Sequence, residues 1–402
     1  MKNQDVVFID GVRTAFGRMG GTIRDFSCSR LGVFALKGLL EKNQILEKTH
    51  VDCLFAGSAT HCSEAWNPAR WVSLAAGLPY ETSASYIEMQ CGSAIDAINH
   101  AAWKIKLGFA DVIIAGGMES YSQMPAKFSM STPPYKLQPP MPLNCTLAPD
   151  PADAIGMGLT AENLQQKYGI SREASDEFAC TSQMRAKEAI EAGYFKEEIV
   201  PITIPATRKT EEIVFDADEH PRPDTTLEAL ANLKPVFKAD GTVTAGNASG
   251  QNDGGAFVLM MRADKAKELN LTPMAKWISG ADFGCDPKIM GIGPAYAILL
   301  ALEHVGMKLA DLDVIECNEA FAVQNLAVIQ ELETTSGEAI DREKWNPMGG
   351  AIAFGHPNGA SGARIGMFAM RHLIRTQGRY GVFSSCCGGG LGVATVIENL
   401  QI

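Results

Sequence analysis

"CGSAIDAINHAAWKIKLGFADVIIAGG", residues 91–117, predicts a helix built largely from small residues, a turn at Gly108, and an apolar strand that ends in two glycines. "NGASGARIGMFAMRHLIRTQGRYGVFSSCCGGG", residues 358–390, has the same order of features. Strands this apolar are typical of sheets covered on both faces. The repetition predicts a duplicated α/β unit whose small-residue helices pack closely between two sheets.

A second pair of matching segments supports the duplication. "SRLGVFALKGLLEKNQ", from residue 29, predicts an apolar helix that leads to the strand "VDCLFAG", and "GPAYAILLALEHVGMK", from residue 293, leads in the same way to "LDVIECN". Both matches recur after about 265 residues. We therefore expect an N-terminal α/β half at 1–120, completed by about 248–270, and a C-terminal α/β half at 271–402.

The segment between the halves has a different composition. Residues 125–151 hold eight of the twenty prolines, which predicts an extended, turn-rich course. Residues 171–195 predict an amphipathic helix whose apolar face ends at Ile190 and which Gly193 closes. We interpret 121–247 as an inserted loop domain, and long insertions of this kind usually carry function.

Charge and cysteine content narrow the function classes. A net charge of -11 disfavours a nucleic-acid-binding surface, and no apolar run is long enough to span a bilayer. The ten cysteines include no CxxC pair, so we expect no metal site and a reducing compartment. The first strand begins near residue 6, which leaves no room for a leader segment. A cytoplasmic protein is expected.

Cys91 and His356 are the first candidates for chemistry. Cys91 precedes a helix, where the helix N-terminus lowers a thiol pKa and favours a nucleophile; the alternative is a small buried side chain. His356 lies in "GGAIAFGHPNG", where glycines allow backbone and substrate to approach the imidazole. It is either a proton acceptor for the thiol or a histidine hydrogen-bonded within a turn.

Two further polar segments follow predicted strands. Asn318 and Glu319 in "ECNEAFAVQ" either face a cleft or cap the next helix. Cys386 and Cys387 precede three glycines, whose N–H groups form either an oxyanion-binding concavity or a tight turn, and the two thiols are alternatively a redox pair. Strand ends are where α/β sheets assemble their sites.

Five segments then carry a resemblance along nearly the whole chain: CGSAIDA, NASGQNDGGA, NEAFA, GGAIAFGHPNGASGAR and CCGGGLG. Together with "IDGVRTAFGR" near the start, they resemble the signature motifs of thiolases, in the same order. The resemblance implies a five-layered α-β-α-β-α fold. It also implies an acyltransferase that cleaves 3-oxoacyl-CoA with coenzyme A, or runs the reverse Claisen condensation, in fatty acid metabolism.

The resemblance assigns roles residue by residue. Cys91 matches the cysteine that carries the acyl group, and His356 the histidine that activates it. Cys386 matches the cysteine that moves the proton at C2 of acetyl-CoA. Asn318 matches the residue that holds the enolate oxygen through a water, together with the histidine. The N–H groups of Cys91 and Gly388 match a second oxyanion hole.

Coenzyme A contacts are implied for Ser249 and Met157, and also for Phe321 and Arg222. Arg222 has the alternative of a solvated loop arginine. The resemblance implies acyl-CoA and CoA as binding partners, no tightly bound cofactor, and a homodimer or homotetramer.

The chain departs from the family pattern at two positions. Gly156 stands where thiolases that make acetoacetyl-CoA commonly have histidine, and Asn358 replaces an apolar residue after the proline. These changes argue against a strictly two-carbon reaction. Two alternatives remain on the same scaffold: a β-ketoacyl synthase, which Cys386 disfavours, and a non-catalytic acyl-CoA-binding protein.

Overall fold

The structure is a computed structural model that describes residues 5–62, 64–129, 139–206, 208 and 210–402. The N-terminal half has a sheet in the order β1-β9-β5-β3-β4, in which β3, β4 and β5 are parallel and β9 is antiparallel to both neighbours. Its strands are β1 (Val6–Thr14), β3 (Cys53–Gly57), β4 (Ser83–Ile87), β5 (Val112–Ser120) and β9 (Asn252–Arg262). Its helices are α1 (Cys28–Asn43), α2 (Ile45–Lys48), α3 (Pro68–Ala75), α4 (Ser93–Lys106) and α8 (Ala263–Glu268).

The C-terminal half repeats this topology, in the order β10-β13-β12-β11, with β11 parallel to β12 and β13 antiparallel to both neighbours. Its strands are β10 (Ala275–Gly284), β11 (Val314–Cys317), β12 (Tyr380–Cys387) and β13 (Leu391–Asn399). Its helices are α9 (Gly293–Glu303), α10 (Ala322–Ser336), α11 (Ala351–Phe354) and α12 (Asn358–Thr376). At the position of β4, this half has a single parallel bridge between Ile315 and Trp345. The duplicated α/β fold is confirmed.

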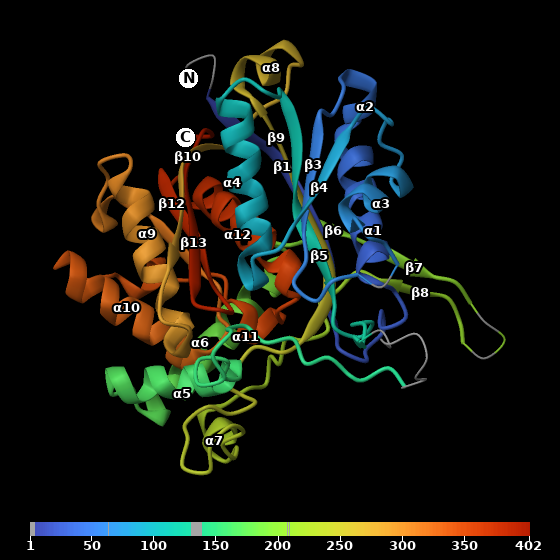
Figure 1. Cartoon of the computed structure of the whole chain (residues 1–402). Coiled ribbons are helices and arrows are strands. Elements are labelled where there is room, and N and C mark those ends of the chain that lie inside the picture. The colour runs from blue at the N-terminus through green and yellow to red at the C-terminus, as the bar shows by residue number, and fades with distance from the viewer. Residues whose placement is uncertain (1–4, 63, 130–138, 207, 209) are drawn as a thin grey trace.

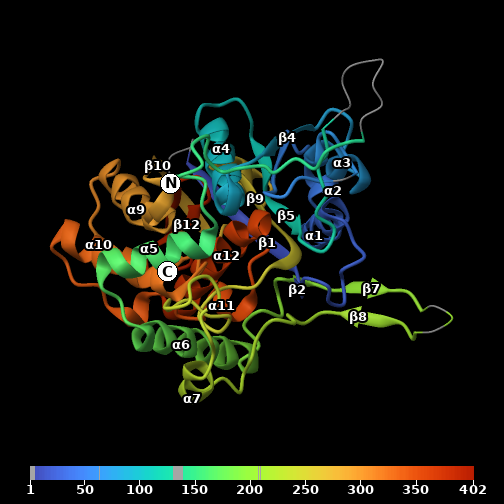
Figure 2. The same ribbon diagram turned by 60° about the horizontal axis from the view of Figure 1, so that its bottom comes forward.

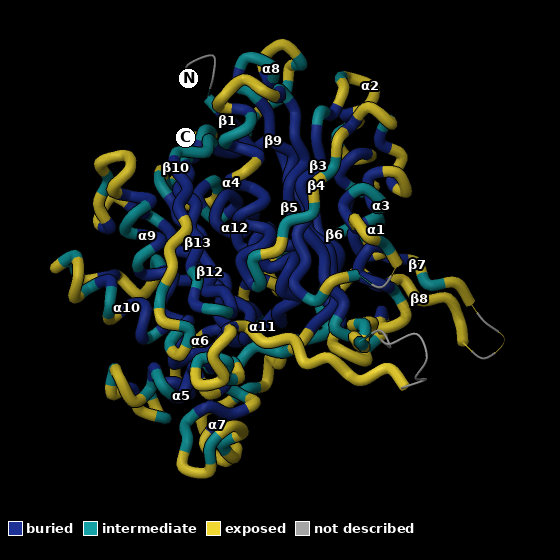
Figure 3. The backbone as a smooth tube through the Cα atoms, in the orientation of Figure 1, coloured by how far each residue is buried: buried dark blue, intermediate teal, exposed yellow. Residues whose placement is uncertain are grey.

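The layers follow the expected α-β-α-β-α arrangement. Figure 1 shows α4 and α12 between the two half-sheets, with α1 and α3 covering one outer face and α9 and α10 the other. The half-sheets join where β1 pairs with β10 over Val6–Phe8, so the strands form one continuous ladder. Small residues let the central helices approach: a Cβ on Gly362 of α12 would lie 2.6 Å from Ile95 Cγ1 of α4. The central helices are buried along most of their length (Figure 3).

The inserted segment contributes helices at one end of the core and a hairpin beside it. It contains α5 (Met157–Tyr168), α6 (Arg172–Glu191), β6 (Ile199–Val200), β7 (Ile202–Ile204), β8 (Ile213–Phe215) and α7 (Leu227–Ala231). β6 pairs with β1, and β7 and β8 extend away from the core (Figure 2). β2 (Gly17–Arg18) pairs with β9. Of the proline-rich excursion at 125–151, residues 130–138 lie outside the described residues.

Among the described helices, none is long and apolar enough to cross a membrane.

Candidate active site

Cys91 lies in a 3₁₀ turn, Gln90–Gly92, between the end of β4 and the start of α4. Gln90 has φ 48°, a left-handed conformation that is uncommon outside glycine and often marks functional sites. Ser93 holds the turn, because its Oγ donates to Gln90 O at 2.6 Å and accepts from the Met89 N–H at 3.0 Å. The turn fixes a thiol that is only 8% exposed.

The resting state of Cys91 differs from expectation. Burial raises the pKa of its thiol to about 12, the Glu119 carboxylate adds to the rise, and the N–H groups of Gly388 and of Cys91 itself oppose it. The prediction that the helix N-terminus lowers this pKa is wrong, because desolvation outweighs the local dipoles. Cys91 is a neutral thiol at pH 7, so it needs a base to become a nucleophile.

His356 lies two residues before α12 and has a defined tautomer. Its Nδ1 is 2.7 Å from Ser361 Oγ, which donates its own proton to Pro357 O at 3.1 Å, so Nδ1 carries the ring hydrogen. Nε2 is 3.3 Å from the donor Nδ2 of Asn318 and is therefore the acceptor. Burial lowers the pKa of His356 to about 3, and the Arg364 charge lowers it further. The imidazole is neutral, and Nε2 is its unprotonated nitrogen.

Glycine beside His356 permits a close backbone contact. The His356 N–H donates to Asn252 Oδ1 at 3.1 Å, and Gly355 has φ 86°. A Cβ on Gly355 would lie 2.2 Å from Asn252 Cγ, so a side chain there would displace the asparagine. His356 is thus hydrogen-bonded within a turn through its backbone N–H and its Nδ1, and the turn leaves Nε2 pointing at Asn318.

Asn318 follows β11 and does not cap the next helix. α10 begins at Ala322, with Phe321 as its N-cap residue and no side-chain cap. The Asn318 N–H donates to Ser384 O at 2.9 Å, which anchors the residue beside β12. Within the described part of the chain its buried Oδ1 has no hydrogen-bond partner. Such an atom leaves room for an ordered water or a ligand.

Cys386 and Cys387 end β12 and face opposite sides of the sheet. Cys386 packs in the apolar cluster under α9 and α10, and Cys387 packs in the cluster around α4 and α12. The redox-pair interpretation is wrong, because successive strand residues point in opposite directions. Burial raises the pKa of both thiols, and electrostatic interaction with Cys91 raises each further. Both residues therefore lie near Cys91, Cys387 with its sulfur against Gly92. The glycines after them form the turn between β12 and β13, and Gly388 directs its N–H to the Cys91 sulfur.

The structure brings these residues together in two groups. Cys91 lies with Gly388 and Cys386, and His356 lies with Asn318. No hydrogen bond joins the Cys91 thiol to the imidazole among the described residues; the two groups sit at the N-terminal ends of α4 and α12, which pack together.

The residues assigned to coenzyme A also lie in two places: Phe321, Met157 and Ser249 in one, and Arg222 in the other. Phe321 stacks edge-on against Phe237 with ring centroids 6.3 Å apart, and Met157 belongs to the same apolar cluster. The Ser249 N–H donates to Ala320 O at 3.0 Å, beside Phe321. Arg222 is exposed and lines a separate cavity of about 280 Å³, together with His220 and other residues of the insertion.

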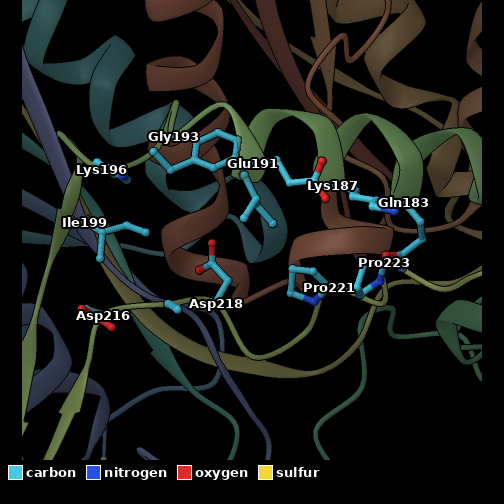
Figure 4. A pocket seen from close by; sticks show the side chains of 13 residues that line it. Gln183, Lys187, Glu191, Gly193, Lys196, Ile199, Asp216, Asp218, Pro221 and Pro223 are labelled. Carbon is cyan, nitrogen blue, oxygen red and sulfur yellow. The ribbon is translucent and has the colours of Figure 1, made fainter.

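A larger cavity of about 420 Å³ lies between α6 and residues 216–223 (Figure 4). None of the predicted site residues is among the described residues that line it. Ile190, expected on the buried face of α6, forms part of its wall and is 42% exposed. This cavity is therefore distinct from the candidate active site.

Sequence reasoning missed two residues of the site. Ser361 lies in "NGASGAR", where the small residues were interpreted as packing, yet its hydroxyl fixes the His356 tautomer. Glu119 ends β5 and accepts from Ser58 Oγ at 3.0 Å, from Ala59 N at 2.9 Å and from Gly359 N at 3.0 Å. A carboxylate after an apolar strand was a signal that could have identified Glu119.

Comparisons with known proteins give one consistent result. Residues 6–264 match the thiolase N-terminal domain and residues 271–399 the thiolase C-terminal domain. The chain is 42% identical to an acetyl-CoA acetyltransferase of Allochromatium vinosum, over 99% of this chain and all of that protein.

Solved structures of similar fold lead to the same family. The crystal structure of the Bacillus anthracis acetyl-CoA acetyltransferase has a TM-score of 0.89 at 43% identity, covering 98% of this chain and 99% of that one. The human mitochondrial 3-ketoacyl-CoA thiolase in complex with CoA has a TM-score of 0.88 at 40% identity, covering 99% of this chain and 98% of that one.

Proposed function

The chain belongs to the thiolase family of acyltransferases, and on that premise we propose that it cleaves a 3-oxoacyl-CoA with coenzyme A through an acyl group carried on Cys91. The reaction is reversible, so the same site also supports the Claisen condensation of two acyl thioesters. The matches to thiolases do not favour the β-ketoacyl synthase or the non-catalytic alternative.

The observation that carries the proposal is that a neutral thiol and a neutral imidazole lie at the N-terminal ends of two helices, α4 and α12, that pack together. Cys91 holds its proton at pH 7, and the unprotonated Nε2 of His356 is the acceptor that we assign to it. The Cys91 sulfur then attacks the 3-oxo carbon, and the N–H groups of Gly388 and Cys91 stabilise the oxyanion that forms.

Carbon–carbon cleavage uses the second group of residues. When the C2–C3 bond breaks, the acyl group stays on Cys91 and acetyl-CoA leaves as an enolate. His356 has by then become a donor at Nε2, so it and the Asn318 amide are placed to hold the enolate oxygen. Cys386 keeps its proton because of its raised pKa and donates it to C2. The thiol of coenzyme A then gives its proton to the Cys386 thiolate and its sulfur attacks the acyl carbon. The Cys91 sulfur leaves and takes back the proton that His356 held.

Coenzyme A binding is proposed for the apolar wall at Met157 and Phe321, beside Ser249, with Arg222 near the nucleotide end. The support is the edge-on packing of Phe321 on Phe237 and the cavity beside Arg222. We propose no tightly bound cofactor and no metal. The boundaries at residues 120, 247 and 270 remain our proposal for the domain organisation.

A homo-oligomer, dimer or tetramer, is proposed from the edge of the N-terminal sheet. β4 pairs with β3 on one side only within the described residues, and exposed Trp66 and Tyr80 lie near it. Asn67 Nδ2 donates to Ala84 O at 3.2 Å, which places Trp66 beside this edge. An unpaired edge with exposed aromatic residues favours a second copy. Light scattering that finds only monomer would contradict this proposal.

A cytoplasmic location is also proposed, because the ten cysteines are all free thiols in the structure.

The test of the proposed function is mass spectrometry of the intact protein after mixing with acetyl-CoA, followed by peptide mapping. We expect a gain of one acetyl group on Cys91, which free coenzyme A removes. A thiolysis assay with acetoacetyl-CoA and with a medium-chain 3-oxoacyl-CoA completes the test. An adduct on Cys386, or no thiolysis of either substrate, refutes the proposal.

A further inference from the structure

Two thiols outside the proposed active site lie together at the start of α1. Cys28 is the first residue of that helix and is buried, and Cys62 is half-buried in the loop that follows β3. The thiols interact with each other. Ser29, next to Cys28, has its Oγ 2.8 Å from the Cys62 sulfur. The two cysteines are distant in sequence, so the fold has brought them together.

The surroundings of the two thiols differ, and the difference sets which one reacts. The Cys62 sulfur accepts from the Glu64 N–H at 3.5 Å and faces the N-terminal end of a 16-residue helix. The Cys28 sulfur instead lies 3.4 Å from Ser58 Oγ and 3.6 Å from Met118 O, and Met118 precedes the Glu119 carboxylate. The Cys62 sulfur thus has the Ser29 hydroxyl and the Glu64 N–H beside it, whereas the Cys28 thiol has the Met118 carbonyl as an acceptor for its proton. Interaction between the two groups lowers the pKa of Cys62 and raises the pKa of Cys28, which agrees with Cys62 as the residue that reacts as a thiolate.

We propose that Cys28 and Cys62 form a thiol pair that a hydroperoxide oxidises to a disulfide, with Cys62 as the attacking residue and Cys28 as the resolving residue. The Cys62 sulfur attacks one oxygen of hydrogen peroxide, the O–O bond breaks, and hydroxide leaves as water after taking a proton. The Cys62 sulfenic acid is then attacked by the Cys28 sulfur, and a second water leaves with the Cys28 proton. Two thiols lose two electrons and one peroxide becomes two waters.

The bond would cross-link α1 to the loop that supports Glu119. Ser58 and Ala59 of that loop donate to the Glu119 carboxylate, which in turn holds the Gly359 N–H at the start of α12. The oxidised pair thus fixes a loop that is linked through Glu119 to the start of α12, without using Cys91 or Cys386.

Peroxide titration of the full-length reduced protein tests the pair. After each addition, free thiols are blocked with N-ethylmaleimide and the protein is digested without reductant. We expect a peptide pair that contains Cys28 and Cys62 and is two hydrogens lighter than the sum of the free peptides. Cys145, which is exposed, is the internal control and should stay alkylated at the lowest peroxide concentrations.

Variants separate the two roles. In Cys28→Ala, dimedone should trap a sulfenic acid at Cys62; in Cys62→Ser, Cys28 should remain a free thiol. Ser29→Ala should slow oxidation of Cys62 about five-fold, because the thiolate loses one hydrogen bond. The proposal is overturned if wild-type Cys28 and Cys62 are both recovered with maleimide at excess peroxide, if Cys145 reacts before Cys62, or if Cys62 pairs with another cysteine.

Discussion

The two halves of the chain place different residues at equivalent positions of one repeated fold. Two residues before the central helix, the N-terminal half has Cys91 and the C-terminal half has His356. At the end of the strand beside that helix, the first half has Glu119, whose carboxylate accepts from five donors, and the second half has Gly388 directly after the strand, with its N–H facing the thiol. The duplicated frame therefore brings two helix starts together, and in our proposal the residue that differs between the copies makes one the nucleophile and the other the base.

The two halves also differ in the residue that follows the neighbouring strand, β3 in the first half and β11 in the second. Ser58, after β3, donates to Glu119, and Asn318, after β11, faces His356. In the first half the polar groups satisfy one another. In the second half Asn318 Oδ1 is left without a partner among the described residues. A buried donor or acceptor without a partner costs stability, and such costs concentrate at functional sites.

Cys91→Ser breaks the comparison most strongly. A serine hydroxyl has a much higher pKa than the thiol it replaces, so we expect no acyl adduct and a loss of thiolysis turnover of about 10³-fold or more. Intact-protein mass spectrometry and a steady-state assay measure both. Cys145→Ser, at an exposed position, is the control and should retain wild-type turnover. An adduct that persists on the Cys91→Ser protein would move the nucleophile elsewhere.

Cys386→Ser should separate the two halves of the reaction. We expect Cys91 to be acetylated at near wild-type rate by acetyl-CoA, and thiolysis of acetoacetyl-CoA to fall about 10²- to 10³-fold, because only the latter needs a proton at C2. Cys53→Ser, the same substitution at a buried thiol of β3, is the matched control. Equal losses in acylation and in thiolysis for Cys386→Ser would show that the residue only packs.

Ser361→Ala tests whether the His356 tautomer matters. Without the hydroxyl acceptor at 2.7 Å, the ring hydrogen is no longer held on Nδ1, and we expect kcat to fall about ten-fold with little change in KM. Nitrogen-15 NMR of the imidazole reports the tautomer directly. Wild-type tautomer and wild-type kcat in Ser361→Ala would contradict this positioning role, and Ser336→Ala on α10 serves as a serine-to-alanine control.

The smallest effect is on stability and concerns pH. The folded protein holds His356 neutral with a pKa of about 3, while an unfolded histidine binds a proton below about 6.5. The unfolded state therefore gains protons first on acidification, and the contribution of this group to stability falls as pH drops from about 6.5 towards 3. We expect the wild type to lose about 2 kcal/mol more than His356→Asn between pH 7 and pH 5. Denaturant unfolding at equal protein concentration measures the difference, and equal losses in both proteins would show that the imidazole is not buried as a neutral base.

Much of the fold and of the site could be predicted from the sequence, for physical reasons. The two small-residue helices needed close neighbours, and the apolar strands needed cover on both faces, which together fixed the layers. Cys91, His356, Asn318 and Cys386 could be proposed from the sequence because polar side chains at strand ends have few structural roles, and their catalytic roles stay a prediction. Ser361 could not, since a serine among glycines and alanines does not differ in pattern from a packing residue.

Properties that depend on the three-dimensional surroundings of a residue could not be predicted from the sequence. The pKa of Cys91 is set by the depth of its burial and by Glu119, which lies 28 residues further along the chain. The contact of Cys62 with Cys28 and Ser29 depends on a loop meeting a helix start, and no periodicity reports it. The opposite directions of Cys386 and Cys387 follow from strand geometry once β12 is known to continue through both residues.

The position of β9 has a consequence for synthesis on the ribosome. β9 lies between β1 and β5, yet 131 residues, 121–251, separate it from β5 in the chain. The N-terminal sheet therefore cannot close when β5 emerges from the exit tunnel, and at typical translation rates the nascent chain waits roughly 7 to 30 s for the strand that completes it. During that interval the apolar flanks of β1 and β5 are both open, so the nascent chain needs a trigger-factor-like holdase more than the finished protein does.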